Sequence, residues 1–129
     1  MSEPRPRDIL GRPLPHDADP SIVVAGVPDR ARISDEEAWA EGIDYLDRHM
    51  PFHAHEVFEM RWRQAPERDR AAWQGLAQWG AALTHAARGN PVGAARVAER
   101  AAARLSGASH VPACVDVARV LDSCARLNS

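Results

Sequence analysis

The stretch that decides the fold is PFHAHEVFEMRWR, residues 51–63. Its first residue is proline, which is favoured at the first position of a helix, so we expect a helix to begin there and run to about Gln64. Within it His55, Glu59 and Trp62 follow at spacings of four and three residues, which places them in one stripe along the helix. An imidazole, a carboxylate and an indole in one stripe predict a polar site on this helix.

A helix is also predicted directly before this stretch. Residues 34–37, SDEE, form a capping-box pattern, in which Ser34 accepts a hydrogen bond from the Glu37 amide and the Glu37 side chain reaches back. Large apolar residues follow at helical spacing and define its buried stripe: Trp39, Ile43 and Leu46. We expect this first helix to end near Arg48 or His49.

Three more helices are predicted towards the C-terminus. The longest covers about residues 67–88, where Gly80 allows a neighbouring helix to approach closely. A Gly-Asn-Pro junction ends it and starts the next helix, over about residues 91–105. A last amphipathic helix is predicted over about residues 112–127. The predicted fold class is therefore all-α, a single compact bundle of about five helices.

The N-terminal part of the chain has a different composition. Residues 1–33 hold most of the ten prolines, with Asp and Arg interspersed, so they cannot sustain a helix or a strand ladder. We therefore divide the chain into an extended Pro/Arg/Asp-rich arm, residues 1–33, and a helical domain, residues 34–129. The arm is either disordered or docked through its apolar residues, along the helical body or on a neighbouring subunit.

Composition narrows the function classes. The net charge is −2 and the sixteen basic residues are scattered, so no field attracts nucleic acid and we expect no nucleic-acid partner. No apolar run approaches the roughly 18 residues of a membrane span, and the N-terminus lacks a signal-peptide core. Cys114 and Cys124 lie ten residues apart in one predicted helix, a rise of about 15 Å that excludes a disulfide between them. These features predict a cytoplasmic protein with no membrane partner.

The polar stripe of residues 51–63 needs partners. If the aromatic residues that flank it are buried, His55 and Glu59 are partly buried too, and leaving either group unpaired in the interior is costly. The two can bond to each other, and the next helix offers a second polar stripe made of Gln74, Gln78 and His85. The predicted polar site comprises His55, Glu59, Trp62, Gln74 and Gln78.

Three interpretations of this site stay open. In the first, His55 and Glu59 share a divalent metal ion, with His85 as the third ligand. In the second, Glu59 is a general base or His55 a proton shuttle. In the third, the cluster is a satisfied core network that only fixes helix packing. The sequence has no glycine-rich phosphate loop and no nucleophile elbow, while a cysteine nucleophile stays open.

The same residues resemble a known family. Its hallmark is His, three residues, Glu, two residues, then Trp or Tyr, which His55, Glu59 and Trp62 fit. The chain also has AHE at 54–56, QGL at 74–76 and RGNP at 88–91, and over about residues 35–105 it resembles the bacterial and archaeal family called domain of unknown function 309. The resemblance implies a compact all-helical fold and a signature proposed to be functional, with metal binding as one suggestion. The chain differs at residues 49–51, HMP, where the resemblance implies a turn with glycine and an acidic residue.

The leading functional hypothesis is a cytoplasmic helical domain whose His/Glu/Gln polar site binds a divalent metal ion as its cofactor. The alternative is a non-catalytic structural or protein-interaction module in which the His and Glu network only fixes helix packing. Small residues on the helix faces also permit close approach of a second copy, so a homodimer is among the expected partners, beside a small molecule or another protein.

Overall fold

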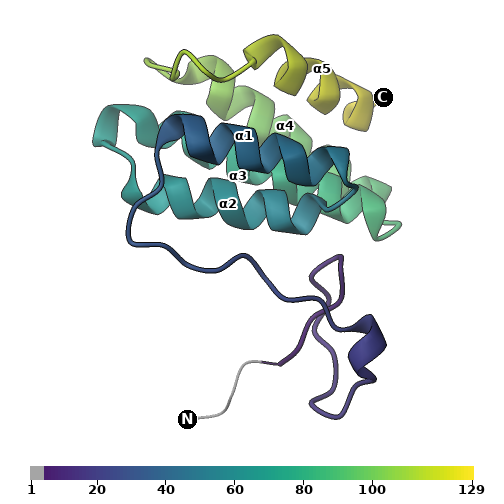
Figure 1. Ribbon diagram of the computed structural model, residues 1–129. Helices are drawn as coiled ribbons and strands as arrows, with labels where there is room; N and C mark the ends of the chain where they lie inside the picture. Colours follow the sequence, from purple (N-terminus) through teal and green to yellow (C-terminus); the bar gives the residue numbers. More distant parts are fainter. Residues whose placement is uncertain (1–4) are drawn as a thin grey trace.

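The computed structural model describes residues 5–129, which form five α-helices (Figure 1). They are α1 (Asp35–Asp47), α2 (Pro51–Gln64), α3 (Glu67–Ala87), α4 (Pro91–Gly107) and α5 (Val117–Asn128). A short 3-10 helix, η1 (Pro20–Ile22), lies in the N-terminal segment. The predicted all-α class is confirmed. No helix formed by these residues combines the length and the apolar character needed to cross a membrane.

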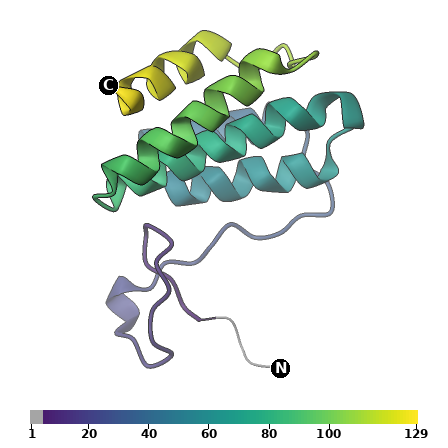
Figure 2. The same cartoon turned by 180° about the vertical axis from the view of Figure 1, so that it is seen from behind.

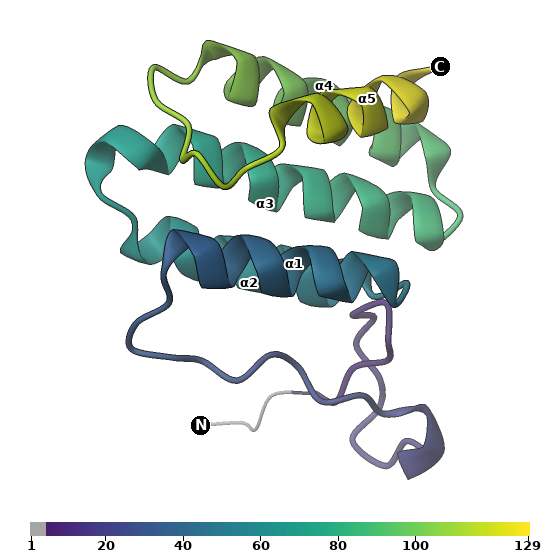
Figure 3. The ribbon, with the colours of Figure 1, turned by 45° about the horizontal axis from the view of Figure 1, so that its top comes forward.

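Helix α3 occupies the middle of the bundle. It packs against α2 on one side and against α4 and α5 on the other, while α1 packs on α2 and α5 on α4. Figure 3 shows this succession, and Figure 2 shows it from behind with α4 in front of α3. Because α3 has neighbours on both sides, its two tryptophans, Trp73 and Trp79, are fully buried.

The helix boundaries follow from local chemistry. Ser34 and Glu37 form both hydrogen bonds of the predicted capping box at the start of α1. Helices α2 and α4 each have proline in the first turn, where the missing N–H costs nothing. Between α3 and α4, Gly89 has a φ of 78°, and the Asn90 side chain accepts a hydrogen bond from the amide of Gly93.

The turn between α1 and α2 contains a residue with an unusual backbone conformation. His49 has a φ of 59°, in the left-handed region that favours glycine. Its amide donates to the carbonyl of Leu46, and the amide of Met50 donates to that of Tyr45. The resemblance implies a turn with glycine here, and in this chain a histidine forms the turn instead. Its left-handed backbone conformation costs about 1 kcal/mol.

The core holds an aromatic cluster. Phe58 of α2 has its ring centroid 6.3 Å from that of Trp39, 6.1 Å from that of Trp73 and 6.1 Å from that of Trp79. Aromatic pairs at such separations add to the stabilisation from apolar burial. Gly42 of α1 makes this packing fit, because a Cβ there would overlap the Phe58 ring. The large rings fill the space that the many alanines leave between helices.

The last helix begins later than predicted. We expected it to open at Pro112, but α5 begins at Val117 and is capped by Asp116, whose side chain accepts a hydrogen bond from the amide of Arg119. Before this cap, the amide of Val115 donates to the carbonyl of Pro112 in a turn. Proline suits both the first helical position and a turn, so the aspartate cap decides where α5 starts.

The N-terminal arm docks along the helical body. His53 of α2 donates from Nε2 to the carbonyl of Ala25 at 2.7 Å. The Gln64 side chain donates to the carbonyl of Arg30 at 2.7 Å and accepts from the amide of Ile33 at 2.9 Å. The end of the arm, from Ala25 to Ile33, is therefore bonded to α2, while the η1 segment projects from the bundle (Figure 1). Residues 1–4 of the predicted arm fall outside the described part of the chain.

Candidate functional site

His55 and Glu59 of α2 form a direct pair. His55 Nε2 lies 3.1 Å from Glu59 Oε2, as their spacing of one helical turn predicts. The other carboxylate oxygen of Glu59 accepts from Arg63 at 2.9 Å. The two side chains are 24% and 37% exposed, so the pair lies at the half-buried edge of α2. It is therefore accessible to a ligand.

The second ring nitrogen of His55 is fixed by the backbone of α3. Nδ1 lies 2.8 Å from the carbonyl oxygen of Ala77, and because a carbonyl only accepts, Nδ1 carries the hydrogen. In the neutral imidazole, Nε2 then presents a lone pair towards Glu59, which is itself an acceptor. The contact between these two atoms is attractive only when a cation, either a proton or a metal ion, is shared between them. The two facing acceptor atoms are therefore able to share a proton or another cation.

A glycine in α3 positions His55. A Cβ on Gly80 would lie 2.8 Å from the Cα and 2.9 Å from the backbone N of His55. Contacts this short do not occur, so only glycine lets the backbone of α2 come this close to α3. The predicted role of Gly80 in close helix packing is confirmed, and this approach places the His55 ring within reach of the Ala77 carbonyl.

A pocket of about 310 Å³ opens around the pair. The arm supplies one wall and the outer face of α2 the other. Its lining residues are Arg7, Val27, Asp29, Phe52, His55, Glu56, Glu59, Met60 and Arg63. Three of these are carboxylates and two are arginines, so with neutral His55 the lining carries a small negative excess. This balance favours a cationic group.

Periodicity within the helices did not reveal the arm side of this pocket. Asp29 and Arg7 reach the site only because the arm docks on α2, and Glu56 is held in place there by the Val27 amide, 3.4 Å from its carboxylate. The Arg7 guanidinium carbon also lies 5.5 Å from the centre of the Phe52 ring. Such cation and ring contacts give no periodic signal in the sequence.

The structure does not bring the predicted α3 partners to this pocket. Gln74 and Gln78 are not among its lining residues, and the Gln78 Oε1 atom is buried without a hydrogen-bond partner. His85 lies near the end of α3, where its Nδ1 accepts from Asn90 at 3.2 Å. The reason is that α2 faces α3 through small and apolar residues, while His55 reaches the α3 backbone at one edge of this contact.

The expected three-ligand metal cluster is therefore not formed by His55, Glu59 and His85. Among residues 5–129, no three His, Cys, Asp or Glu side chains gather closely enough to hold a metal ion together. Trp62, the last residue of the predicted stripe, is half-buried, and the Arg70 guanidinium carbon lies 5.6 Å from its ring centre. It packs against the hydrophobic core and does not line the pocket.

A second polar cluster was not predicted. Asp35 Oδ1 accepts from Arg61 Nε at 2.8 Å and from the indole N–H of the fully buried Trp73 at 2.9 Å. Arg61 also donates to the carbonyl of Ile33 at 3.1 Å. The cluster joins the arm to α1, α2 and α3, and its members hold one another, so we assign it to the fold.

The two cysteines are free thiols with little tendency to ionise. Burial raises the pKa of the Cys114 thiol, and the nearby Glu36 and Asp35 carboxylates raise it further. Burial alone raises the pKa of Cys124. A reactive cysteine needs a lowered pKa, so neither thiol has the environment of a nucleophile.

Both thiols should accordingly react slowly with iodoacetamide near neutral pH. The thiolate is the reacting form, and a raised pKa lowers its fraction at a pH below that value. We expect both residues to be alkylated more slowly than glutathione in the folded protein, and at similar rates to glutathione in urea. Mass spectrometry of timed samples measures the two rates, and a cysteine that outpaces glutathione in the folded state would contradict this expectation.

Comparison with known proteins agrees with the sequence motifs. Residues 39–97 match the family described as Domain of unknown function (DUF309). The chain resembles the DUF309 family. The matching segment contains all of α2 and α3, and thus the His55 and Glu59 pair together with Gly80. No curated protein and no solved structure gives a match. The DUF309 resemblance predicted from the sequence is confirmed.

Proposed function

We propose that this DUF309-like chain is a helical binding domain whose His55 and Glu59 pair takes up a divalent metal ion. The observation that supports it is the hydrogen bond from His55 Nδ1 to Ala77, which directs the Nε2 lone pair towards Glu59 Oε2 at 3.1 Å. Metal-binding histidines commonly donate their other N–H to a carbonyl in this way. The bond from Arg63 to Glu59 holds the carboxylate in place at the same time.

The donor set limits the kind of metal ion. One imidazole nitrogen and one carboxylate oxygen suit Zn²⁺ and its neighbours among the first-row transition metals. The His55 and Glu59 pair supplies two ligands, so water or a group of a bound small molecule would fill the remaining coordination positions of the metal ion. A site with free positions is open to ligands, and the pocket beside the pair has room for one.

Zinc titration tests the proposal. We expect isothermal titration of the metal-free protein to show saturable binding of one Zn²⁺, and His55→Ala or Glu59→Gln to weaken it at least about tenfold, because each removes one of two protein ligands. The matched control is His85→Ala, which removes an imidazole near the end of α3 that does not contact the pair. Equal binding by Glu59→Gln and the unchanged protein, or no saturable binding at all, would overturn the proposal.

One observation supports a second candidate, a non-catalytic structural or interaction module. The pair is already connected to the fold, through Ala77 on α3 and Arg63 on α2, and with a proton in place of a metal it fixes how α2 sits on α3. Under this alternative His55→Ala lowers the melting temperature and no metal binds. A partner, which includes a second copy of the chain, would then bind elsewhere on the surface, and light scattering after gel filtration would measure the oligomeric state.

A further inference from the structure

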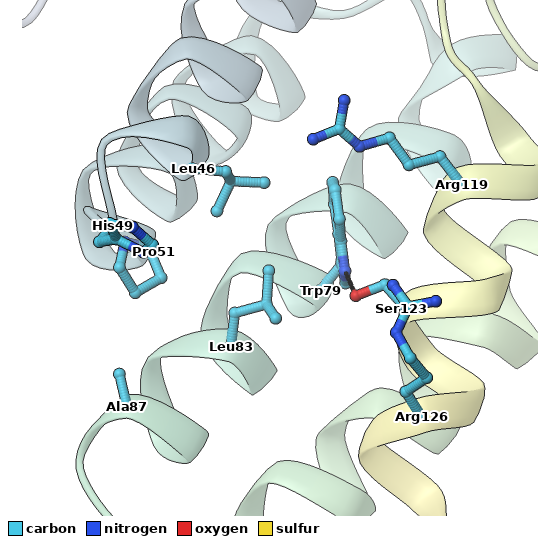
Figure 4. A pocket seen from close by; sticks show the side chains of 9 residues that line it. All are labelled: Leu46, His49, Pro51, Trp79, Leu83, Ala87, Arg119, Ser123 and Arg126. Carbon is cyan, nitrogen blue, oxygen red and sulfur yellow. Dashed lines mark hydrogen bonds between the residues drawn. The ribbon is translucent and has the colours of Figure 1, made fainter.

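A second pocket, which shares no residue with the first, lies between the α1–α2 turn, α3 and α5 (Figure 4). Its volume is about 340 Å³, at the lower end of the range of small-molecule sites. Its lining residues are Leu46, His49, Pro51, Trp79, Leu83, Ala87, Arg119, Ser123 and Arg126. The three elements that contribute them are far apart in the sequence and meet only in the fold.

The inner part of this pocket is apolar. Leu46 and Leu83 point into it from α1 and α3, and the Trp79 indole stands between them and α5 (Figure 4). The indole N–H donates to Ser123 Oγ at 2.8 Å, so its one polar atom is already paired. Because Trp79 itself is buried beneath them, the half-buried Leu46 and Leu83 side chains present the apolar surface that gains from covering by another apolar group.

Two arginines stand at the edge of this apolar surface. Arg119 and Arg126 are exposed, and their spacing of seven residues places them on the same side of α5, on either side of Trp79 in Figure 4. Among the described lining residues there is no carboxylate. Arg119 also has a carboxylate neighbour outside the lining, Asp47, whose Oδ1 lies 3.4 Å from its guanidinium at the exposed surface, an ion pair that contributes little to stability.

We propose that this pocket binds a small carboxylate with an apolar tail. Arginine pairs with carboxylates through parallel N–H bonds, and two guanidinium groups beside an apolar cavity match an anionic head on an apolar body. The head group lies between Arg119 and Arg126, and the tail covers Leu46 and Leu83, close to the buried Trp79 ring. This assignment is independent of the metal site, because it uses none of the residues around His55.

Octanoate is a suitable probe, and 1-octanol has nearly the same tail without the charge. We expect two-dimensional NMR titration to show saturable shifts of the Trp79 indole resonance with octanoate, and at least about tenfold weaker binding of 1-octanol. The double variant Arg119→Gln with Arg126→Gln should weaken octanoate binding at least about tenfold, while Arg100→Gln on α4 should leave it unchanged. Equal affinity for octanoate and 1-octanol, or shifts that do not saturate, would overturn the proposal.

Neighbouring alanines at the end of α3 give a second, matched test. Ala86 and Ala87 are both exposed, so a glutamate is tolerated at either, but only Ala87 lines the pocket. Ala87 lies at the edge of the pocket away from the two arginines (Figure 4), so Ala87→Glu places a charge beside the apolar tail and should weaken octanoate binding several-fold, whereas Ala86→Glu should have a much smaller effect. Equal weakening by the two substitutions would mean that the anion binds elsewhere, and the proposal would fail.

Discussion

Gly80→Val is expected to destabilise the protein by about 3 kcal/mol, at the upper end of what overpacking of a core usually costs. Even a Cβ at this position would lie 2.8 Å from the His55 Cα, and the atoms it meets belong to the backbone of α2. A rigid helix backbone cannot move aside as the end of a flexible side chain can, so α2 and α3 must separate. The gain in helix propensity over glycine is below about 1 kcal/mol and does not offset this loss.

Urea unfolding followed by circular dichroism measures the effect. The matched control is Gly107→Val at the end of α4, where a Cβ would meet nothing within 4 Å and where we expect a change within about 0.5 kcal/mol. If Gly80→Val unfolds at the same urea concentration as the unchanged protein, the close approach of α2 and α3 is wrong. Separation of the helices also removes the bond from His55 to Ala77, so the variant should lose any affinity of the pair for metal.

The helix boundaries were predictable because their signals are local. The capping box at Ser34, the proline at 51 and the Gly-Asn-Pro junction at 89–91 each act within one turn of the chain, and all three are present in the structure. The start of α5 was not predictable from Pro112, because proline fits a turn as well as a first helical turn. Asp116 caps α5 and sets its first residue at Val117. Whether the helix starts there or at Pro112 depends on how the segment between these residues packs.

The site was predictable only in part, for a physical reason. Helical spacing places His55 beside Glu59, and this pair is present. Their other partners are a backbone carbonyl at Ala77 and the docked arm, and neither leaves a periodic pattern in the sequence. Treating Phe52 and Trp62 as the buried side of α2 also misplaced the stripe. The buried side of α2 instead includes His53, Val57, Phe58 and Met60, which leaves Phe52 and Trp62 half-buried.

Asp35→Ala should cost about 3 kcal/mol, because it removes the acceptor of two donors at once. The Trp73 indole N–H is left without a partner in the core, and Arg61, whose side chain is 14% exposed, loses its ion pair. Asp35→Asn keeps an oxygen for the indole and removes only the charge, so we expect about half of this loss. Thermal and urea unfolding measure both variants.

Glu36→Ala is the matched control, because it removes a negative charge from the start of α1 without removing a member of the Asp35 cluster. Both residues are acidic and lie in the first turn of α1, but Glu36 is exposed and forms no hydrogen bond with Trp73 or Arg61. Glu36→Ala should therefore cost below about 1 kcal/mol, the value of a carboxylate near a helix N-terminus. If the two alanine variants are equally stable, the Asp35 contacts contribute nothing beyond the helix dipole. If Asp35→Ala is less stable than Glu36→Ala by about 2 kcal/mol or more, the Asp35 carboxylate joins α1, α2 and α3. Through Arg61 and Ile33 it then also holds the end of the arm, and the arm forms one wall of the pocket around His55.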